Sequence, residues 1–304
     1  MRSDETTPSG VTAAEELRPL LFSIAYRMLG SVADAEDVVQ EAFLRRATAG
    51  EVESERAFLT TVTTRIAIDV LRSARRRRET YVGSWLPEPL VEAEGPARVE
   101  DDESVSLAFL VLLERLAPID RAVLVLREAF DLGYEEIARI VGRTAENCRQ
   151  ILSRARRRVA DDRPRFDADP TARDALAARF LAAAREGDLD GLVSMLATDA
   201  VLVGDGGGRA RSIPRPMHGA ARVARALAAF YGQSEAWGIA FVPGRVNGQP
   251  GFRTLDSEGR IAGVAAFDVV GGRVVAVRSI VNPDKLRHLG PVSDVGLRPS
   301  FRRE

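Results

Sequence analysis

The chain has 304 residues, 45% hydrophobic and 29% charged, which favours two or three domains and excludes wholesale disorder. Lysine and arginine number 43 against 44 aspartates and glutamates, so the net charge of −1 indicates no particular partner. With one cysteine and two histidines, we expect neither an internal disulfide nor a zinc site, and no other metal or cofactor. The sequence shows no signal peptide and no apolar run near the roughly 20 residues of a membrane span, so we expect a cytoplasmic protein without membrane contact.

Residues 12–80 are predicted to form a helical domain. Apolar residues recur at helical spacing from Leu17 to Met28, and Gly30 is expected to end that helix. Ser31 is expected to cap the next helix. A third helix is predicted from about Arg56 into the arginine-rich run at residues 72–78, which carries five arginines and no acid.

An acidic stripe marks the second of these helices. Asp34, Asp37 and Glu41 fall within one narrow arc at helical spacing. Acidic residues near a helix N-terminus can simply compensate the helix dipole, or they can form a docking face for a basic partner. Composition alone leaves both interpretations open.

Residues 81–104 are predicted to form an acidic linker. Two prolines in Trp85-Leu-Pro-Glu-Pro89 prevent a regular helix, and residues 87–103 contain seven acidic residues. The helical pattern resumes over residues 105–163 and contains a helix-turn-helix pattern at residues 132–158. Gly142 is expected to make the turn and Thr144 to cap the second helix.

The second helix of this pair is amphipathic. Cys148, Ile151, Leu152, Ala155 and Val159 share one stripe, so we interpret Cys148 as a core residue rather than a nucleophile. The opposite arc is rich in hydrogen-bond donors suited to base edges and phosphates. The alternative is an ordinary helix pair with a solvated basic face.

After Pro164 an α+β pattern is predicted. Two short helices over residues 171–198 and one over residues 220–231 accompany strands at 200–203, 239–242, 252–255, 260–270 and 273–281, which we expect to form an antiparallel sheet. Gly271-Gly272 indicates a tight hairpin between the last two strands. Asp199 and His218 are candidate acid/base residues, although loop and turn positions are the favoured interpretation. Phe241, Phe252 and Phe267 are expected to fill the sheet core rather than line a pocket.

Three segments in order, residues 34–45, 58–72 and 134–158, resemble the extracytoplasmic-function (ECF) sigma factors, which are specificity subunits of bacterial RNA polymerase. Trp85-Leu-Pro-Glu-Pro89, Asp205-Gly-Gly-Gly208 and Asn282-Pro-Asp-Lys-Leu286 resemble motifs of the SigJ-like subgroup, whose members carry a C-terminal SnoaL-like domain of the nuclear-transport-factor-2 (NTF2) fold. The resemblance implies two all-α sigma domains followed by a cone-shaped α+β domain. The implied boundaries are 12–80 for the sigma-2 domain, 81–104 for the linker, 105–163 for the sigma-4 domain, 168–286 for the SnoaL-like domain and 287–304 for a flexible tail.

The resemblance also implies roles for particular residues. Contact with the polymerase core is implied for Asp34, Asp37, Gln40 and Glu41. Residues 48–56 would capture a flipped promoter base. Contact with promoter DNA, at the −10 element for the first helical domain and the −35 element for the second, is implied for Arg65, Asp69, Arg72, Arg75, Arg76, Arg143, Thr144, Glu146, Asn147, Arg149, Gln150, Ser153, Arg154 and Arg157.

In this subgroup the appended domain takes the place of a separate anti-sigma protein. We therefore expect a regulatory contact formed by Trp85, Pro87, Asp205, Gly206, Gly207, Gly208, Asn282, Pro283, Asp284, Lys285 and Leu286. The predicted function is promoter-specific transcription initiation without catalysis by this chain, with a small molecule as a possible further ligand of the C-terminal domain. The alternative is a ligand-sensing DNA-binding regulator or a SnoaL-type enzyme.

Overall fold

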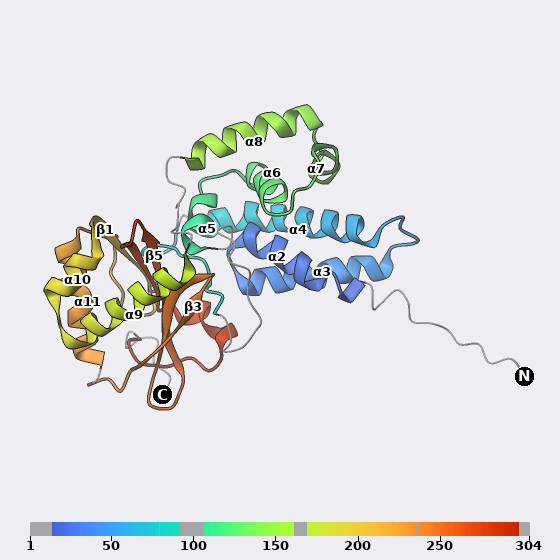
Figure 1. The fold of residues 1–304 in the computed structure, drawn as a ribbon. Helices are drawn as coiled ribbons and strands as arrows, with labels where there is room; N and C mark the ends of the chain where they lie inside the picture. Colours follow the sequence, from blue (N-terminus) through green and yellow to red (C-terminus); the bar gives the residue numbers. More distant parts are fainter. Residues whose placement is uncertain (1–13, 79, 92–105, 161–168, 235, 298–304) are drawn as a thin grey trace, which may run out of the picture. The chain divides into compact units, whose positions relative to one another are not determined.

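The computed structural model describes residues 14–78, 80–91, 106–160, 169–234 and 236–297, with only the backbone described for residues 74–78 (Figure 1). The chain divides into two compact units. The helical unit comprises residues 1–76 and 113–161, and the C-terminal unit comprises residues 77–112 and 162–304. The described part of the linker, residues 80–91, therefore belongs to the C-terminal unit and is not an independent spacer. Within the described ranges no helix combines the length and the hydropathy of a membrane span.

The helical unit begins with α2 (Arg18–Leu29), α3 (Val32–Thr48) and α4 (Glu55–Arg78). Gly30 ends α2 as predicted, because it adopts a left-handed φ of 64° and its N–H donates to the Tyr26 carbonyl at 2.7 Å. The predicted cap of α3 is also confirmed, since the Ser31 hydroxyl accepts from the Asp34 N–H at 3.1 Å. Leu21, Val39 and Leu59, which come from the three helices, form part of one buried cluster.

The same unit contains α6 (Pro118–Glu128), α7 (Tyr134–Val141) and α8 (Ala145–Ala160). Gly142 adopts a left-handed φ of 66° between α7 and α8, and the Thr144 hydroxyl accepts from the Asn147 N–H at 3.2 Å. Both features of the predicted helix-turn-helix are confirmed. The predicted apolar stripe of α8, including Cys148, is buried, and burial raises the pKa of the Cys148 thiol.

From residue 169 onward, the described part of the C-terminal unit contains a sheet and three α-helices. The helices are α9 (Pro170–Glu186), α10 (Leu189–Met195) and α11 (Ala220–Ser234). The strands are β1 (Leu196–Asp205), β2 (Met217–His218), β3 (Ala240–Val246), β4 (Gln249–Leu255), β5 (Ile261–Val270) and β6 (Arg273–Ile280). They form one six-stranded sheet in the order β2-β1-β6-β5-β4-β3. Gly271 and Gly272 have φ values of 59° and 68°, which confirms the predicted hairpin turn.

The prediction of an antiparallel sheet is wrong at one position. Strands β1 and β6 are parallel neighbours, with Asp205 opposite Ile280. A parallel pair requires a long connection, which the chain supplies through β2, α11 and β3 to β5. This pairing brings the end of β1 beside the segment that follows β6.

Both faces of the sheet are buried. Phe267 and Val269 of β5 pack in a cluster with α9, α10 and α11, which cover one side of the sheet (Figure 1). Val264 and Ala266 alternate with them along the strand and therefore face the opposite side. That opposite cluster also contains residues of the linker, of α5 (Leu107–Leu113) and of the segment after β6: Leu86, Val91, Leu107, Val111, Leu286, Leu289 and Val292.

The segment after β6 is folded as far as residue 297. It forms two short 3₁₀ helices, Pro283–Lys285 and Arg287–Leu289, and Ser293 then donates a hydrogen bond to the Asp256 carboxylate at 2.6 Å. The Arg211 N–H donates to the Gly296 carbonyl at 2.9 Å, and Leu297 is buried. The prediction of a flexible tail from residue 287 is therefore wrong for residues 287–297, because hydrogen bonds and apolar contacts hold them to the sheet. Residues 92–104 of the predicted linker and 298–304 of the predicted tail lie outside the described residues.

Candidate functional site

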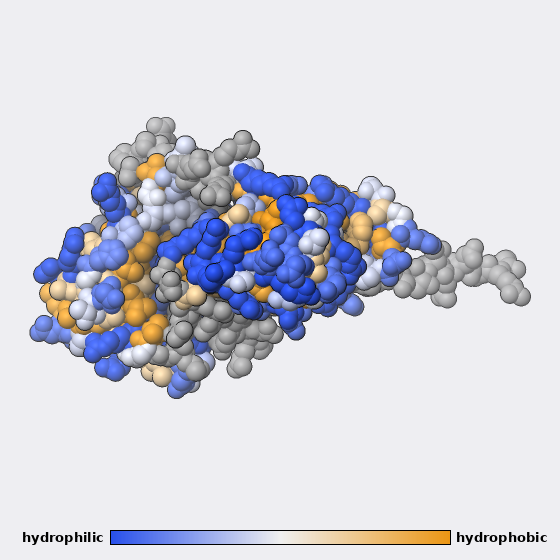
Figure 2. Space-filling model, turned by 90° about the horizontal axis from the view of Figure 1, so that it is seen from above, coloured by the Kyte–Doolittle hydropathy of each residue, from blue (hydrophilic) through white to orange (hydrophobic). Residues whose placement is uncertain are grey.

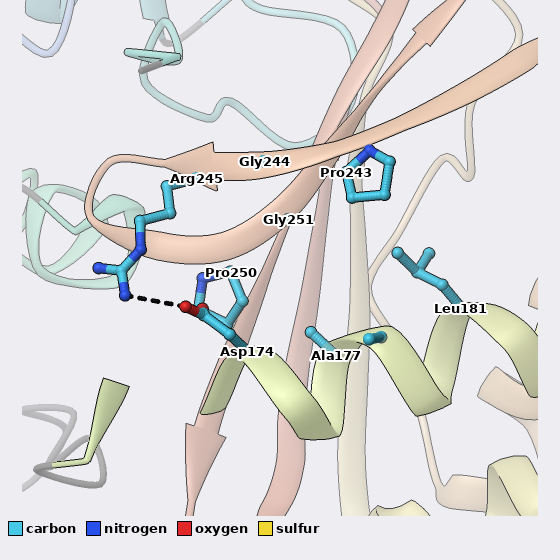
Figure 3. Close-up of a pocket in the computed structure, with 9 residues that line it drawn as sticks. Asp174, Ala177, Leu181, Pro243, Gly244, Arg245, Pro250 and Gly251 are labelled. Atoms are coloured by element: carbon cyan, nitrogen blue, oxygen red, sulfur yellow. Dashed lines mark hydrogen bonds and ion pairs between the residues drawn. The ribbon is translucent and has the colours of Figure 1, made fainter. Parts of the chain in front are cut away.

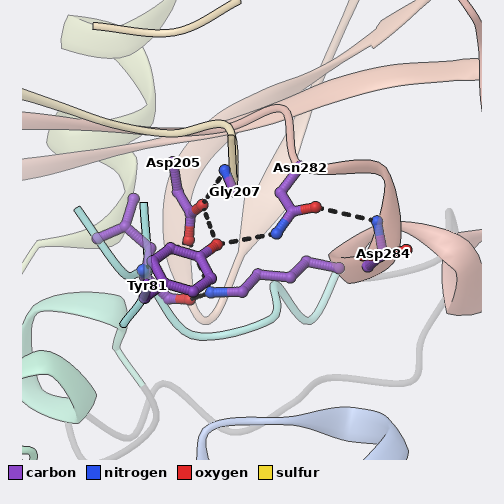
Figure 4. Close-up of polar contacts among 7 residues, drawn as sticks. Tyr81, Asp205, Gly207, Asn282 and Asp284 are labelled. Atoms are coloured by element: carbon purple, nitrogen blue, oxygen red, sulfur yellow. Dashed lines mark hydrogen bonds and ion pairs between the residues drawn. The ribbon is translucent and has the colours of Figure 1, made fainter. Parts of the chain in front are cut away.

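A buried carboxylate is the centre of the contact between the linker and the C-terminal domain. Asp205 ends β1 and is fully buried. Its Oδ1 accepts from the Tyr81 hydroxyl (Figure 4). Its Oδ2 accepts from the Leu86 N–H at 2.8 Å and from Lys285 Nζ at 2.6 Å. Tyr81 and Leu86 come from the linker, whereas Lys285 follows β6. One side chain therefore joins three segments that are far apart in the sequence.

The parallel pairing of β1 with β6 explains why these segments meet. The Asp205 carbonyl accepts from the Val281 and Asn282 N–H groups at 2.8 and 3.0 Å. The Asn282 side chain then donates to the Tyr81 hydroxyl at 2.8 Å (Figure 4). A Cβ on Gly207 would lie 2.2 Å from the Asn282 amide nitrogen, and the Gly207 φ of +56° also disfavours a side chain. Glycine at 207 is therefore required for this close approach.

Lys285 completes the contact. Its side chain is buried, and its ammonium group donates to the Leu86 carbonyl as well as to Asp205. The same ammonium lies 4.2 Å from the ring centre of Trp85 and 5.0 Å from that of Tyr81. Two acceptors and two aromatic faces thus surround one compact cation, which compensates for its removal from water. We name Tyr81, Leu86, Asp205, Asn282 and Lys285 the anchor network.

The three motifs that carry the predicted regulatory contact are thus brought together. Pro87 is buried beside Leu86, and Leu286 is buried in the cluster on that face of the sheet. Pro283 begins the first 3₁₀ helix. Asp284 accepts from Arg209 at 2.9 Å, which ties the motif after β6 to the loop of Gly206, Gly207 and Gly208.

Sequence reasoning missed two members of this contact. Tyr81 lies before the Trp85 motif, and burial, followed by the nearby Asp205 charge, raises the pKa of its hydroxyl. Asn247 in the β3–β4 turn accepts from the Leu90 N–H at 2.9 Å and donates its own N–H to the Leu90 carbonyl at 2.8 Å. Asn-Gly is a typical hairpin-turn pair, a signal at residues 247 and 248 that the sequence analysis did not use, but nothing local indicates the bond to the linker.

In the helical unit, the predicted DNA-reading side chains of α8 are solvent-facing. Asn147 is half-buried. Arg143 and Thr144 are exposed just before the helix, and the remaining side chains are exposed on the side opposite the buried stripe: Glu146, Arg149, Gln150, Ser153, Arg154 and Arg157. Hydrophilic residues dominate the face of this unit seen from above (Figure 2). Arg149 bonds Glu146 at 3.3 Å and stacks 5.0 Å from the ring centre of Tyr134. The arrangement offers cationic donors on an exposed helix, as major-groove binding requires.

The predicted DNA contacts of α4 have partners within the protein. Arg65 donates to the Ile140 and Arg139 carbonyls at 2.9 and 2.8 Å, and Arg72 pairs with Asp69 at 2.8 Å. The side chains of Arg75 and Arg76 lie outside the described residues. Arg65 is exposed, and its guanidinium is bonded to the end of α7.

The acidic stripe of α3 is accessible. Asp37 and Gln40 are exposed and Asp34 and Glu41 are half-buried, with Glu41 bonded to Arg45 at 2.8 Å. Buried residues occupy the other side of the helix. This exposed arc can accept a basic partner without unfolding the helix.

The predicted base-capturing loop, residues 48–56, is closed at its ends by an ion pair. Arg46 donates to both oxygens of Glu55 at 2.6 and 2.8 Å. That hydrogen bonding raises the pKa of Arg46 and lowers the pKa of Glu55. Sequence reasoning did not anticipate the pair.

The favoured interpretation of Asp199 and His218 as turn and loop residues is wrong, because Asp199 lies in β1 and His218 in the neighbouring strand β2. Asp199 and His218 are both exposed. The aromatic side chains behave as predicted, because Phe252 and Phe267 are buried in the core and Phe241 packs against it. A pocket of about 160 Å³ lies between α9 and the β3–β4 hairpin, where Asp174 bonds Arg245 at 3.0 Å (Figure 3). It is smaller than typical ligand sites, and neither candidate lines it.

Comparisons with known proteins agree with this geometry. The Sigma-70 region 2 model matches residues 13–77, and the Sigma-70 region 4 model matches residues 106–159. The ECF RNA polymerase sigma factor SigJ of Mycobacterium tuberculosis is 39% identical over 96% of this chain and 97% of its own length. The probable ECF RNA polymerase sigma factor SigI of the same species is 34% identical, over 88% of this chain and 92% of its own. The crystal structure of M. tuberculosis SigJ matches with a TM-score of 0.75 at 36% identity, over 91% of this chain and 98% of that chain.

This chain belongs to the ECF sigma factors of RNA polymerase. Helices α2–α4 form region 2, α6–α8 lie in region 4, and the α+β unit is an appended C-terminal domain, as the match to the SigJ crystal structure over 91% of this chain indicates. The sigma factor directs transcription initiation at promoters through binding, so RNA polymerase and promoter DNA are its partners. The alternatives of a free-standing regulator and a SnoaL-type enzyme are not supported.

Proposed function

We propose that the NTF2-like domain regulates this sigma factor by holding residues 80–91 of the linker. The single observation that carries the proposal is the buried Asp205 carboxylate, which binds Tyr81 and Leu86 of the linker and Lys285 of the domain. The linker connects region 2 to region 4 in the sequence. When residues 80–91 are held by the domain, fewer linker residues remain to span the distance between the two regions. The domain thereby sets the relative position of the two sigma regions and takes the role of a separate anti-sigma protein.

Transcription by purified core polymerase tests this proposal. Asp205→Asn removes the charge that holds Lys285, and we expect promoter-specific output to change at least threefold without any added protein. Arg287→Gln removes an exposed partner of Asp284 and serves as the control, with output equal to that of the unaltered factor. Equal output from Asp205→Asn and the unaltered factor would reject regulation through the linker.

We further propose that the exposed arc of α3 docks on the polymerase core. Asp34, Asp37, Gln40 and Glu41 present acceptor groups on one side of the helix while the other side is buried. Asp37→Ala combined with Glu41→Ala is expected to weaken core binding at least tenfold, because each paired charge at an interface carries a substantial part of the affinity. Glu36→Ala changes an exposed acid of α3 that is not among the four proposed contacts and pairs with Arg18, and it is the matched control for the same pull-down.

The exposed arc of α8 is proposed to read the −35 element. Arg149→Ala is expected to reduce binding of holoenzyme to its preferred promoter more than to an altered −35 sequence, because a base contact carries specificity. Arg156→Ala on the same helix, where Arg156 pairs with Glu128 at 2.6 Å, is the control. Equal losses on both sequences would identify Arg149 as a phosphate contact instead.

A further inference from the structure

One stretch of the C-terminal unit carries positive charge without acids. Residues 206–234 contain neither aspartate nor glutamate, although the whole chain holds nearly equal numbers of acids and bases. The basic residues of the stretch are Arg209, Arg211, Arg215, His218, Arg222 and Arg225. Charge is therefore segregated within this unit, and such a pattern is typical of a surface for an anionic partner.

Four of these residues follow one another along an edge of the sheet. Strand β2 is the edge strand beside β1, and it ends at His218. Arg215 precedes this strand by two positions, and α11 begins two positions after it. Arg222 and Arg225 are three positions apart on α11, so they are neighbours on one face of that helix. We name Arg215, His218, Arg222 and Arg225 the basic edge.

The fold does not use the arginines of the basic edge. All three are exposed, and within the described residues their guanidinium groups form no ion pair and no hydrogen bond. Other arginines of the same unit bond carboxylates of the protein, as Arg278 does with Asp268. The exposed Asp199 on the neighbouring strand β1 is outnumbered by the three arginines. Their charge is therefore available to a partner.

The chemistry of the basic edge suits phosphate groups. Arginine presents a planar set of donors that matches the oxygens of a phosphate, and it stays charged at physiological pH. The exposed residues beside the arginines are small or apolar: Pro214, Pro216, Ala221 and Ala229. Their side chains have no polar groups with which to read base edges. The edge therefore fits the backbone of a nucleic acid rather than its bases.

Chain connectivity brings duplex DNA within reach of this surface. Helix α8, proposed above to read the −35 element, ends at Ala160, and α9 begins at Pro170. About ten residue steps span at most about 35 Å, which is roughly one turn of B-DNA. The connection therefore keeps the domain at a high effective concentration near the DNA that flanks the −35 element. Downstream of that element the promoter leads to the −10 element and the polymerase, so the flanking DNA left open lies upstream.

We propose that the basic edge binds the phosphate backbone of duplex DNA upstream of the −35 element. The proposal rests on the contact of α8 with that element, and it gives the C-terminal domain a role apart from its hold on the linker. Arg222 and Arg225 neutralise phosphates, and the release of counterions from these phosphates makes the contact sensitive to salt. The domain thereby adds affinity for promoter DNA without changing which bases are read.

Binding of holoenzyme to two promoter fragments tests this contact. Both fragments carry the same −10 and −35 elements. One ends just upstream of the −35 element, and the other extends farther upstream by about two helical turns, roughly 20 base pairs. Arg222→Gln combined with Arg225→Gln is expected to reduce the preference for the longer fragment about fivefold at about 0.1 M salt. On that fragment, the decrease of log affinity with log salt should become shallower by about 1.8, because each phosphate contact contributes about 0.9.

A matched variant and an altered promoter complete the test. Arg253→Gln combined with Arg287→Gln removes the same charge from β4 and from the segment after β6, and it should leave the preference and the salt dependence unchanged. Discrimination between the preferred and an altered −35 sequence should be equal in all three proteins, because the contact reads no bases. A preference for the longer fragment that survives without Arg222 and Arg225 would belong to the polymerase core and would overturn the proposal. Equal losses of affinity on both fragments would also overturn it, since the two arginines would then bind the polymerase and not DNA.

Discussion

At the scale of single residues, Asp205 and Lys285 carry the contact between the linker and the C-terminal domain. Both side chains are buried, with exposures of 0% and 8%, and each contacts the linker as well as the other. Two charges can remain in such a place only when the geometry satisfies both, because burial removes them from water. Each charge therefore depends on the other. Replacing either side chain with an uncharged one would leave its partner's charge buried without compensation.

Asp205→Asn is expected to lower the free energy of unfolding of the C-terminal unit by about 3 kcal/mol, since it leaves the Lys285 charge buried without its partner. Both tryptophans, Trp85 and Trp237, belong to this unit, so urea unfolding followed by fluorescence reports on it. The exposed pair of Arg287 and Asp284 supplies the control, because Arg287→Gln should cost less than about 1 kcal/mol. Equal losses in the two variants would contradict the importance assigned to Asp205.

Lys285 is the only lysine among the 43 basic residues, and its site suits a compact ammonium group. Lys285→Arg is expected to loosen the linker, because a planar guanidinium does not fit between the Trp85 ring and two acceptors. With Trp237→Phe as background, acrylamide quenching of Trp85 should increase at least twofold. Unchanged quenching would show that the site accepts either cation.

At the scale of elements, the segment after β6 stabilises the hairpin between β4 and β5. Asp256 in this hairpin accepts from Ser293, from the Arg260 side chain at 2.8 Å and from the backbone N–H groups of Glu258 and Arg260. Burial opposes ionisation of the carboxyl, but these donors outweigh it and lower its pKa to about 2. The hairpin and the last described residues are thus joined by one ionised group.

Acid should weaken this junction in a defined pH window. A carboxyl with a pKa of about 2 in the folded chain and about 3.9 in the unfolded chain stabilises the fold above pH 4, and that contribution is lost as the pH falls toward 2. The difference in melting temperature between the unaltered factor and Asp256→Asn is therefore expected to be constant above about pH 5 and to shrink between pH 4 and pH 2. Asp190→Asn, an exposed carboxyl of α10, is the control. A difference that does not vary with pH would refute the role of the ionised form.

At the scale of the whole molecule, the units defined by packing do not coincide with the domains read along the chain. Residues 77–112 lie between the two sigma regions in sequence but belong to the C-terminal unit. Leu86 and Leu107 are buried against the sheet face opposite α9, α10 and α11. Deletion of the C-terminal domain would therefore also expose residues that connect the two sigma regions in the chain.

Truncation after residue 161 tests this division. In the truncated factor Leu86, Leu107 and their neighbours lose their apolar partners, so we expect chymotrypsin to cleave within residues 77–112 at least tenfold faster than in the full chain. Cleavage within α6–α8 should proceed at the same rate in both proteins and serves as the internal control. Equal rates at residues 77–112 would show that this segment is protected without the C-terminal domain.

Local features were predictable because they depend on neighbours in the chain. The end of α2 at Gly30, the caps at Ser31 and Thr144 and the buried stripe of α8 follow from side chains within one or two helical turns. The turn at Gly271-Gly272 follows from backbone freedom alone. For the same reason the segments of α3, α4 and α8 could be recognised as those of an ECF sigma factor.

The sequence by itself determined the helices, their caps, the order of the domains and the motifs that form the linker contact. Only the tertiary structure decided that β1 pairs in parallel with β6, that Tyr81 and Asn247 join the contact, and that Arg65 and Arg121 reach across between the sigma regions. These contacts connect residues 74 to 201 positions apart, and their formation depends on how buried surfaces fit together. No local pattern encodes such a fit, because the free energy that selects it is shared across the whole packed core.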